Sequence, residues 1–158
     1  MTKPARNASS ENTLSSSRIF FATTKASMGR RLFQSEQNAM LLIDVLRAHM
    51  AAGNFLLHDF VVMPDHLHLL MTVRGDMTIE RAMQLIKGRF SYRLKREFQH
   101  LGEVWQRGFS EMRADGDESF LSYREYIAQN PVKAGLAESP GQYPFCYSYL
   151  AKKKANRG

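Results

Sequence analysis

Apolar residues recur along this chain with two spacings, which predict where its strands and helices lie. Runs rich in β-branched and aromatic residues are typical of strands. The predicted strands are residues 18–24, 55–63 and 66–74. Apolar residues three or four positions apart instead predict one helix from Ser35 to about Gly53 and another over residues 78–98. Ser35 and Thr78 are suited to cap these two helices.

The part of the chain that follows residue 100 has shorter periodic segments. A turn and a short fourth strand are predicted within residues 102–110. A last helix is expected over residues 120–129, with Ser119 or Asp117 as its N-cap and Pro131 ending it soon after. The residues from Gly135 onward are predicted to be irregular.

The predicted order is strand, helix, strand, strand, helix, strand, helix, which indicates an α+β protein. The first six elements match a ferredoxin-like (RRM-like) fold, an antiparallel sheet of four to five strands with helices on one face. The other face would then stay free for a functional site. We expect residues 17–150 to form one domain, residues 1–16 a disordered polar leader and residues 151–158 a basic tail.

Two histidines lie two positions apart in the third predicted strand, at His66 and His68. Side chains alternate along a strand, so both rings point to one face, while Leu67 and Leu69 point to the opposite, core face. Adjacent imidazoles can hold a divalent metal ion. Half-exposed histidines on a solvated sheet face are the alternative interpretation, and the spacing alone does not separate the two.

The last predicted helix carries residues that would complete a metal-dependent site. Tyr126 and Asn130 are four positions apart and so share one helix face. The Asn130 amide oxygen is a ligand that Mg²⁺ or Mn²⁺ accepts beside imidazole. The Tyr126 phenol could attack a phosphate polarised by such an ion. Tyr123 is the competing nucleophile, and tyrosines in helices often only pack.

The chain carries a formal net charge of +7, which for a small domain suggests a polyanionic partner such as nucleic acid. Part of this charge lies in the predicted helix over residues 78–98, where no acidic residue occurs between positions 81 and 96. The basic residues there are Arg81, Lys87, Arg89, Arg93, Lys95 and Arg96. An unmixed basic face suggests phosphate contacts, with a merely solvated face as the alternative.

The chain has a single cysteine, Cys146, which excludes an internal disulfide and a cysteine-based zinc site. Its sequence contains neither a secretory signal pattern nor an apolar run near the roughly 20 residues that span a bilayer. We therefore expect a cytoplasmic, nucleoid-associated protein without a membrane partner.

Four segments, in this order, resemble the REP-associated tyrosine transposases, relatives of the single-tyrosine HUH transposases of bacterial insertion sequences. The segments are residues 62–70 (VMPDHLHLL), 87–90 (KGRF), 104–109 (VWQRGF) and 126–136 (YIAQNPVKAGL). The resemblance extends over about residues 19–148. It implies the HUH nuclease fold and a transposase that cleaves and rejoins single-stranded DNA at hairpins.

The resemblance also implies roles for individual residues. By position, His66 and His68 correspond to the family's metal ligands, for Mg²⁺ or Mn²⁺. Tyr126 corresponds to the nucleophile that forms a 5′-phosphotyrosine. Asn130 stands where related transposases have glutamine as a third ligand, so the residue type differs there. The neighbouring polar residues of the second strand, His58 and Asp59, are the alternative third ligands.

Basic and aromatic residues outside this set are the predicted DNA contacts. They are Lys87, Arg89, Arg93, Trp105, Arg107, Lys152, Lys153 and Lys154. Trp105, Phe109 or Tyr92 could stack on an unpaired base. The expected partner is a single-stranded DNA hairpin of the REP type, bound by a monomer or a homodimer.

Two other functions remain compatible with the sequence. A nucleic-acid-binding module on the same fold would keep the histidines for structure and perform no chemistry. A metal-dependent phosphodiesterase would use water as the nucleophile, and Tyr126 would then only pack. A covalent protein–DNA adduct distinguishes the transposase from both.

Overall fold

The computed structural model describes residues 16–157, with side chains as far as Ala155. Most of the predicted leader therefore lies outside the described residues. The elements are β1 (Arg18–Lys25), the 3-10 turn η1 (Ser27–Gly29), α2 (Glu36–Ala51), β2 (Leu56–Val62), β3 (His66–Val73), α3 (Ile79–Phe98), β4 (Ser110–Arg113), α4 (Asp117–Lys133) and α5 (Tyr147–Arg157). Within this range no helix is both long enough and apolar enough to cross a bilayer.

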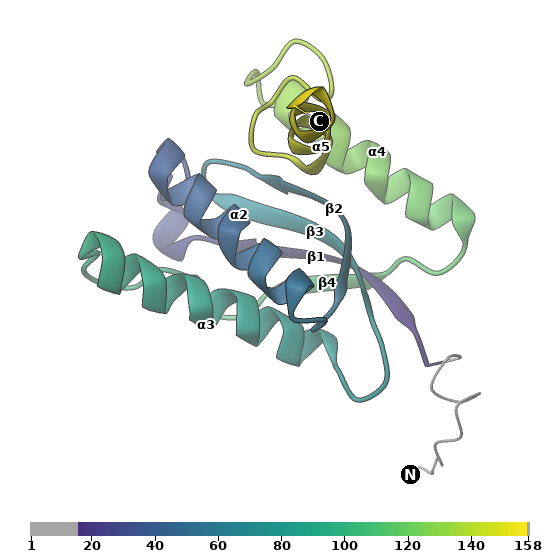
Figure 1. Cartoon of the computed structure of the whole chain (residues 1–158), viewed down its shortest axis with the longest axis horizontal. Coiled ribbons are helices and arrows are strands. Elements are labelled where there is room, and N and C mark those ends of the chain that lie inside the picture. The colour runs from purple at the N-terminus through teal and green to yellow at the C-terminus, as the bar shows by residue number, and fades with distance from the viewer. Residues whose placement is uncertain (1–15, 158) are drawn as a thin grey trace.

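Four strands form one antiparallel sheet in the order β2-β3-β1-β4. One helix connects β1 to β2 and a second connects β3 to β4, and α2 and α3 lie together over one face (Figure 1). This arrangement is the ferredoxin-like fold. The predicted fold class is confirmed.

The two helices on this face begin where their sequences provide caps. The Ser35 hydroxyl accepts a hydrogen bond from the Asn38 N–H at 3.2 Å, and the Thr78 hydroxyl accepts one from the Arg81 N–H at 3.0 Å. Each bond satisfies a backbone donor that a helix start otherwise leaves unpaired. Helix α3 ends where Gln99 adopts a left-handed conformation, with φ of 54°.

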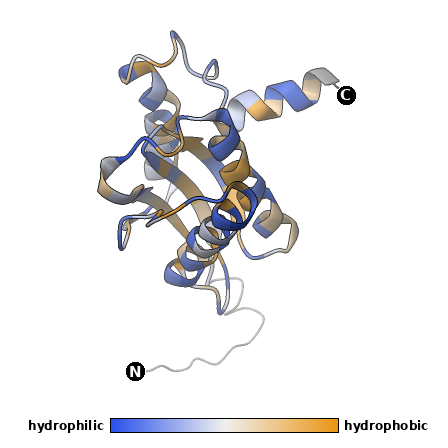
Figure 2. Ribbon diagram, turned by 90° about the vertical axis from the view of Figure 1, so that its left-hand side faces the viewer, coloured by the Kyte–Doolittle hydropathy of each residue, from blue (hydrophilic) through white to orange (hydrophobic). Residues whose placement is uncertain are grey.

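The main core lies between the sheet and these two helices. Alternate residues of β3 point into it and are fully buried, namely Leu67, Leu69, Met71 and Val73. Figure 2 shows the hydrophobic strands enclosed by helices on which hydrophobic and hydrophilic residues alternate. Burying a side chain of this size contributes about 1.5–3 kcal/mol, so this face supplies much of the stability of the domain.

The opposite face of the sheet is covered rather than free. Helix α4 crosses it (Figure 1), and Ile127 packs there in a second apolar cluster with Phe21, Val61 and Leu70. The prediction of helices on one face only is therefore wrong for α4. The physical reason is that this face also carries apolar side chains, which must be removed from water. The covering helix is the one that carries Tyr126.

Helix α4 is longer than the sequence predicts. Its N-cap is Gly116, so the predicted caps Asp117 and Ser119 lie inside the helix. The helix passes Pro131 and ends two residues later, at Lys133, with Ala134 as its C-cap. Proline has no N–H, so the Ile127 carbonyl lacks the usual intrahelical hydrogen bond from position 131.

The fourth strand comes later than predicted. Strand β4 pairs with β1 over residues 110–113, whereas the predicted segment, residues 102–110, makes a single bridge between Trp105 and Ala26. Gly102 and Gly108 both have a positive φ, which breaks the extended conformation between them.

The C-terminal segment is ordered against the edge of β2. The Val62 N–H donates to the Phe145 carbonyl at 2.9 Å, and the Tyr143 hydroxyl donates to the Val62 carbonyl at 2.7 Å. Helix α5 follows directly, and the ring of its first residue, Tyr147, contacts Phe60. The prediction of an irregular segment is therefore wrong from Tyr147 onward, because this stretch covers an otherwise open sheet edge.

Candidate active site

The two histidines of β3 lie side by side on the sheet face that α4 covers. Their ring centroids are 4.6 Å apart, and the ring planes are inclined by 76°. His68 is 5% exposed, whereas the His66 side chain is 24% exposed. The predicted alternation is therefore confirmed, with one ring buried and the other at the rim.

Each histidine has a partner at its Nδ1 atom. His66 Nδ1 donates to Asp65 Oδ1 at 2.6 Å, since a carboxylate can only accept. His68 Nδ1 lies 2.7 Å from the hydroxyl of Thr23, the residue directly opposite it on β1. The Nε2 atom of His68 is buried and has no hydrogen-bond partner among the described residues. Histidines that bind metals typically use their second ring nitrogen for an outer partner of this kind.

The environment keeps His68 neutral. Burial, assisted by the charge of the neighbouring His66, lowers the pKa of His68 to about 3. At neutral pH the ring therefore has a lone pair on one nitrogen, which is the form that binds a metal ion.

Tyr126 projects from α4 onto this pair. Its ring meets His68 edge to face, with the centroids 5.4 Å apart, and the residue is 44% exposed. One turn later, Asn130 has a buried Oδ1 atom without a partner in residues 16–157. Helix α4 thus brings Tyr126 to the histidine face, and Asn130 lies one turn further along the same helix.

The donor set suits a hard divalent ion. No group of three His, Cys, Asp or Glu residues within residues 16–157 could hold a metal. A metal ion bound here would therefore need an amide oxygen as its third ligand, beside the two imidazoles. An unpartnered buried Nε2 and an unpartnered buried Oδ1 are the atoms that such an ion would satisfy.

The alternative third ligands have other partners. His58 Nε2 lies 2.6 Å from the Thr72 hydroxyl, and its ring contacts Phe120 on α4. The Asp59 carboxylate accepts from the Phe60 N–H and lies 3.7 Å from the Arg124 guanidinium. Thr72 is four residues beyond His68 on the same strand, roughly 13 Å away at the usual rise. His58 therefore lies well away from the histidine pair, whereas Asp59 is paired with Leu70, two residues beyond His68. Both residues contact α4 and help to fasten it to the sheet.

Phe21 contacts three aromatic rings at the site. It was not identified from the sequence. Its ring stacks on Tyr123 at 4.5 Å with planes only 8° apart, stacks on His68 at 5.3 Å and meets Tyr126 edge-on at 5.7 Å. The Tyr123 hydroxyl donates to the Met112 sulfur. Tyr123 is thus the packing tyrosine, and Tyr126 is the one that meets the histidine pair.

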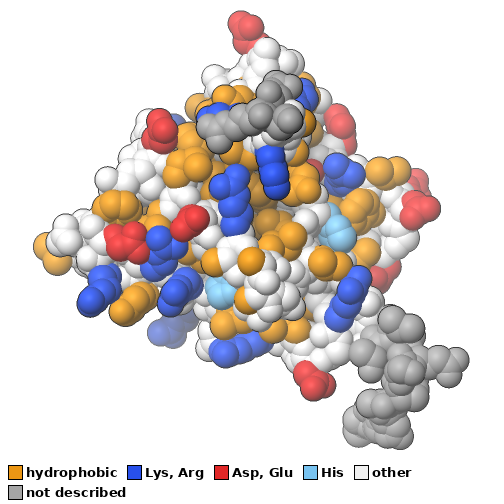
Figure 3. All heavy atoms as spheres, viewed as in Figure 1, with side chains coloured by type: hydrophobic (Ala, Val, Ile, Leu, Met, Phe, Trp, Pro, Cys, Tyr) orange, Lys and Arg blue, Asp and Glu red, His pale blue; other side chains and the backbone are white. Residues whose placement is uncertain are grey.

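The basic face predicted on α3 lies across the sheet from this site. The Arg93 guanidinium binds Glu97 at 2.6 Å and Asp44 of α2 at 2.8 Å, so its charge is largely neutralised. Figure 3 shows Lys and Arg side chains interspersed with acidic ones over α2 and α3. The interpretation of α3 as an unmixed basic surface is wrong in three dimensions, because α2 supplies acidic side chains. Arg89 remains exposed.

Lys87 and Trp105 tie α3 to the loop before β4. Lys87 Nζ donates to the carbonyls of Gln106 and Gly108 at 3.1 and 2.7 Å, and burial lowers its pKa. The Trp105 indole N–H donates to the Lys87 carbonyl at 3.0 Å, and its ring contacts Phe33 and Phe90. Both predicted DNA contacts therefore also have structural roles. Arg107 is exposed in the same loop.

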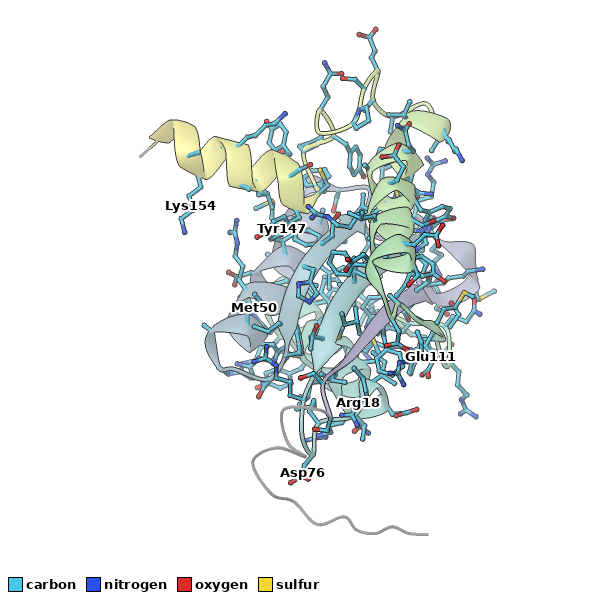
Figure 4. All side chains as sticks on the ribbon, turned by 90° about the vertical axis from the view of Figure 1, so that its right-hand side faces the viewer. Arg18, Met50, Asp76, Glu111, Tyr147 and Lys154 are labelled. Atoms are coloured by element: carbon cyan, nitrogen blue, oxygen red, sulfur yellow. The ribbon has the colours of Figure 1, made fainter. Side chains whose placement is uncertain are left out.

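The three C-terminal lysines, Lys152, Lys153 and Lys154, are exposed on α5. Figure 4 shows α5 extending away from the sheet, with Tyr147 at its base and Lys154 on its outer half. Lys153 and Lys154 line a surface hollow together with Arg47 of α2. The charge of this tail is therefore presented on a helix, at one end of the molecule.

A family profile described as IS200-like transposase matches residues 19–130, which include the whole histidine–tyrosine site. The chain belongs to the IS200-like transposase family. The resemblance predicted from the sequence is thereby confirmed.

Two curated relatives are similar to part of this chain. It is 29% identical over 94 residues to a REP-associated tyrosine transposase of Haemophilus influenzae, a match covering 53% of each chain. It is 28% identical over 92 residues to one of Escherichia coli K12, covering 58% of this chain and 53% of the relative. The chain thus spans about half the length of the curated relatives it matches.

The solved structures support the same fold. A REP-associated tyrosine transposase bound to a REP hairpin has a TM-score of 0.67 and 23% identity, covering 92% of this chain and 82% of its own. A Deinococcus radiodurans transposase has a TM-score of 0.57 and 20% identity, covering 80% of this chain and 95% of its own. These similarities confirm the architecture of the IS200-like domain.

Proposed function

We propose that this IS200-like transposase cleaves and rejoins single-stranded DNA beside hairpins, with Tyr126 as the nucleophile. The observation that carries the proposal is the position of Tyr126, with its ring against His68 and its helix placing Asn130 one turn away. Tyr126 is partly exposed, so a DNA strand can reach its hydroxyl. Tyr123, whose ring is stacked on Phe21, has no such access to the pair.

The reaction is a transesterification in which no bond energy is lost to water. The Tyr126 oxygen forms a bond to the scissile phosphorus while the bond from phosphorus to the 3′ oxygen breaks. The phenol proton leaves the tyrosine, and the departing 3′ oxygen takes up a proton to become a 3′-OH. The product is a 5′-phosphotyrosine, and attack by a 3′-OH on it reverses the step and rejoins DNA.

His66, His68 and Asn130 are the residues that would hold Mg²⁺ or Mn²⁺ at this site. Such an ion supplies Lewis-acid polarisation of the phosphate and stabilises the charge that develops on it. The residues themselves orient the site, because Asp65 and Thr23 hold the two rings and α4 holds the tyrosine. A phenol has an ordinary pKa near 10, so attack at neutral pH requires that its proton be removed as the bond forms.

The proposed substrate is a DNA hairpin of the REP type with a single-stranded flank. One supporting observation is that the solved REP-associated transposase with TM-score 0.67 is bound to a REP hairpin. The other is the charge of +7, part of which is exposed on α5, at Arg89 and at Arg107. Lysines and arginines of this kind bind phosphates without sequence preference.

Incubation with a hairpin oligonucleotide and Mg²⁺ or Mn²⁺, followed by a denaturing gel, tests the proposal. A 3′-end label should move to the protein, and a 5′-end label should appear on a shorter strand ending in 3′-OH. Tyr126→Phe should abolish the adduct, and Tyr123→Phe should retain it. Cleavage without an adduct would indicate a hydrolase, and binding without cleavage would indicate an inactive binding module. Loss of the adduct only in Tyr123→Phe would show that the nucleophile is the other tyrosine.

A further inference from the structure

His66 and His68 have chemically different partners at Nδ1, and each partner influences which ring nitrogen carries the proton. Asp65 meets His66 through a carboxylate oxygen, which accepts and cannot donate. The proton of a neutral His66 ring therefore lies on Nδ1, and its Nε2 carries a lone pair. A solvent-facing histidine without such a partner would exchange between its two tautomers.

Thr23 meets His68 through a hydroxyl, which can either donate or accept. If the hydroxyl donated, the proton of the His68 ring would lie on Nε2. That N–H would be buried without an acceptor among the described residues, which is unfavourable. If His68 Nδ1 donates instead, Nε2 keeps a lone pair, on a ring that contacts both Tyr126 and His66.

We propose that Thr23 and Asp65 are positioning residues that hold His68 and His66 in the Nδ1–H tautomer. Both Nε2 lone pairs are then available to bind one metal ion. The assignment rests on the proposed metal-dependent function, which it extends to the residues behind the ligands. Thr23 is suited to the task because it pairs directly with His68 across β1 and β3, so the sheet register itself fixes the contact. Asp65 is suited because it immediately precedes His66 at the β2–β3 turn.

The chain contains its own control for this inference. Thr72 Oγ1 lies 2.6 Å from His58 Nε2, a second threonine–histidine contact on the same sheet. Thr72→Val therefore removes a bond of the same kind from the same β-sheet while leaving His66 and His68 untouched. Any effect on the sheet alone would be common to Thr72→Val and Thr23→Val.

Two measurements on the full chain test the inference. The first is calorimetric titration with Mn²⁺, in which Thr23→Val and Asp65→Ala should raise the dissociation constant roughly 10–100-fold. Thr23→Ser, Asp65→Asn and Thr72→Val should stay closer to the wild-type protein, because the first two retain an acceptor oxygen. The second is the ¹⁵N spectrum of histidine-labelled, metal-free protein, in which the Nδ1–H signal of His68 should weaken in Thr23→Val and that of His66 in Asp65→Ala.

The outcomes separate this inference from the proposed function. Unchanged Mn²⁺ affinity together with unchanged tautomers in Thr23→Val and Asp65→Ala would overturn the positioning role, even if the wild-type protein forms the DNA adduct. An equal loss of affinity in Thr72→Val would also overturn it, because the effect would then belong to the sheet. If the wild-type protein forms no adduct, the proposed function fails, and the tautomers of the metal-free protein still decide the positioning role.

Discussion

The ring of Tyr126 lies edge-on to the ring of His68, with the two centroids 5.4 Å apart. His68 comes from the centre of the sheet and Tyr126 from a helix that begins more than forty residues after that strand. The contact therefore exists only because α4 folds back across the sheet face that carries the histidines. It links the predicted ligands to the predicted nucleophile within a single chain.

This relationship predicts that the tyrosine acts on the metal site of its own chain. Tyr126→Phe and His68→Ala should each fail to form the DNA adduct, and an equimolar mixture of the two should fail as well. The physical reason is that each variant lacks one half of the site, and α4 packs on its own sheet. The measurement is the denaturing gel described above. An adduct in the mixture would show that the helix is exchanged between two copies.

Asn130 is predicted to contribute a ligand oxygen. Asn130→Ala should weaken Mn²⁺ binding by at least as much as the roughly 10–100-fold expected for loss of an outer partner. Asn130→Asp should bind at least as tightly as the wild-type protein, since a carboxylate oxygen is a stronger ligand for a hard ion. Folding stability should change little in Asn130→Ala, because the buried Oδ1 atom has no hydrogen bond to lose within the described residues. Unchanged Mn²⁺ affinity in Asn130→Ala would exclude this ligand.

Phe21 is predicted to hold the nucleophile helix on the sheet. Phe21→Ala should lower the free energy of unfolding by about 3–5 kcal/mol, as for other buried phenylalanines, because three rings pack against it. Urea denaturation measures the change. Phe98→Ala is the matched control, since Phe98 is exposed at the end of α3 and its loss should cost about 0.5 kcal/mol or less. Equal effects of the two substitutions would contradict the role of Phe21.

Asp59 is predicted to make stability depend on pH. Burial raises the pKa of Asp59 above its usual 3.8, opposed by the Phe60 N–H and by Arg124. The folded protein then binds the proton more tightly than the unfolded chain does. The stability from this group is therefore present at low pH and lost as pH rises through the folded-state pKa.

Asp59→Asn removes this titration while keeping an oxygen for the Phe60 N–H. Urea denaturation across the acidic range should show the variant gaining stability relative to the wild-type protein as pH rises. Asp76→Asn is a suitable control, because Asp76 is exposed in the turn after β3. A relative loss of stability in Asp59→Asn with rising pH would mean that the pairing with Arg124 outweighs burial.

The lysines of α5 and Arg93 are predicted to differ in their effect on DNA binding. Replacing Lys152, Lys153 and Lys154 by alanine should reduce the slope of log affinity against log salt by up to about 2, at roughly 0.7 per phosphate contact on single strands. Arg93→Ala should leave the slope nearly unchanged, because Asp44 and Glu97 already neutralise that charge. Fluorescence anisotropy with a labelled hairpin measures both. A larger change from Arg93→Ala would show that DNA displaces its acidic partners.

Local patterns in the sequence determined most of the elements and the chemistry of the site. The alternation around His66 and His68 placed both rings on one face, and the spacing of Tyr126 and Asn130 placed both on one side of a helix. These statements hold for any strand and any helix, because they follow from the repeat of the backbone itself. The ferredoxin-like order followed from the same patterns.

Only the tertiary structure decided which surfaces meet. The packing of α4 on the histidine face depends on Phe21, Val61, Leu70 and Ile127 being buried together, and these residues are distant in sequence. The same is true of the Arg93 pairing with Asp44, which turned a basic helix face into a mixed one, and of the Thr23 contact with His68, which depends on strand register. Long-range contacts of this kind are set by the packing of the whole chain, and no local repeat encodes them.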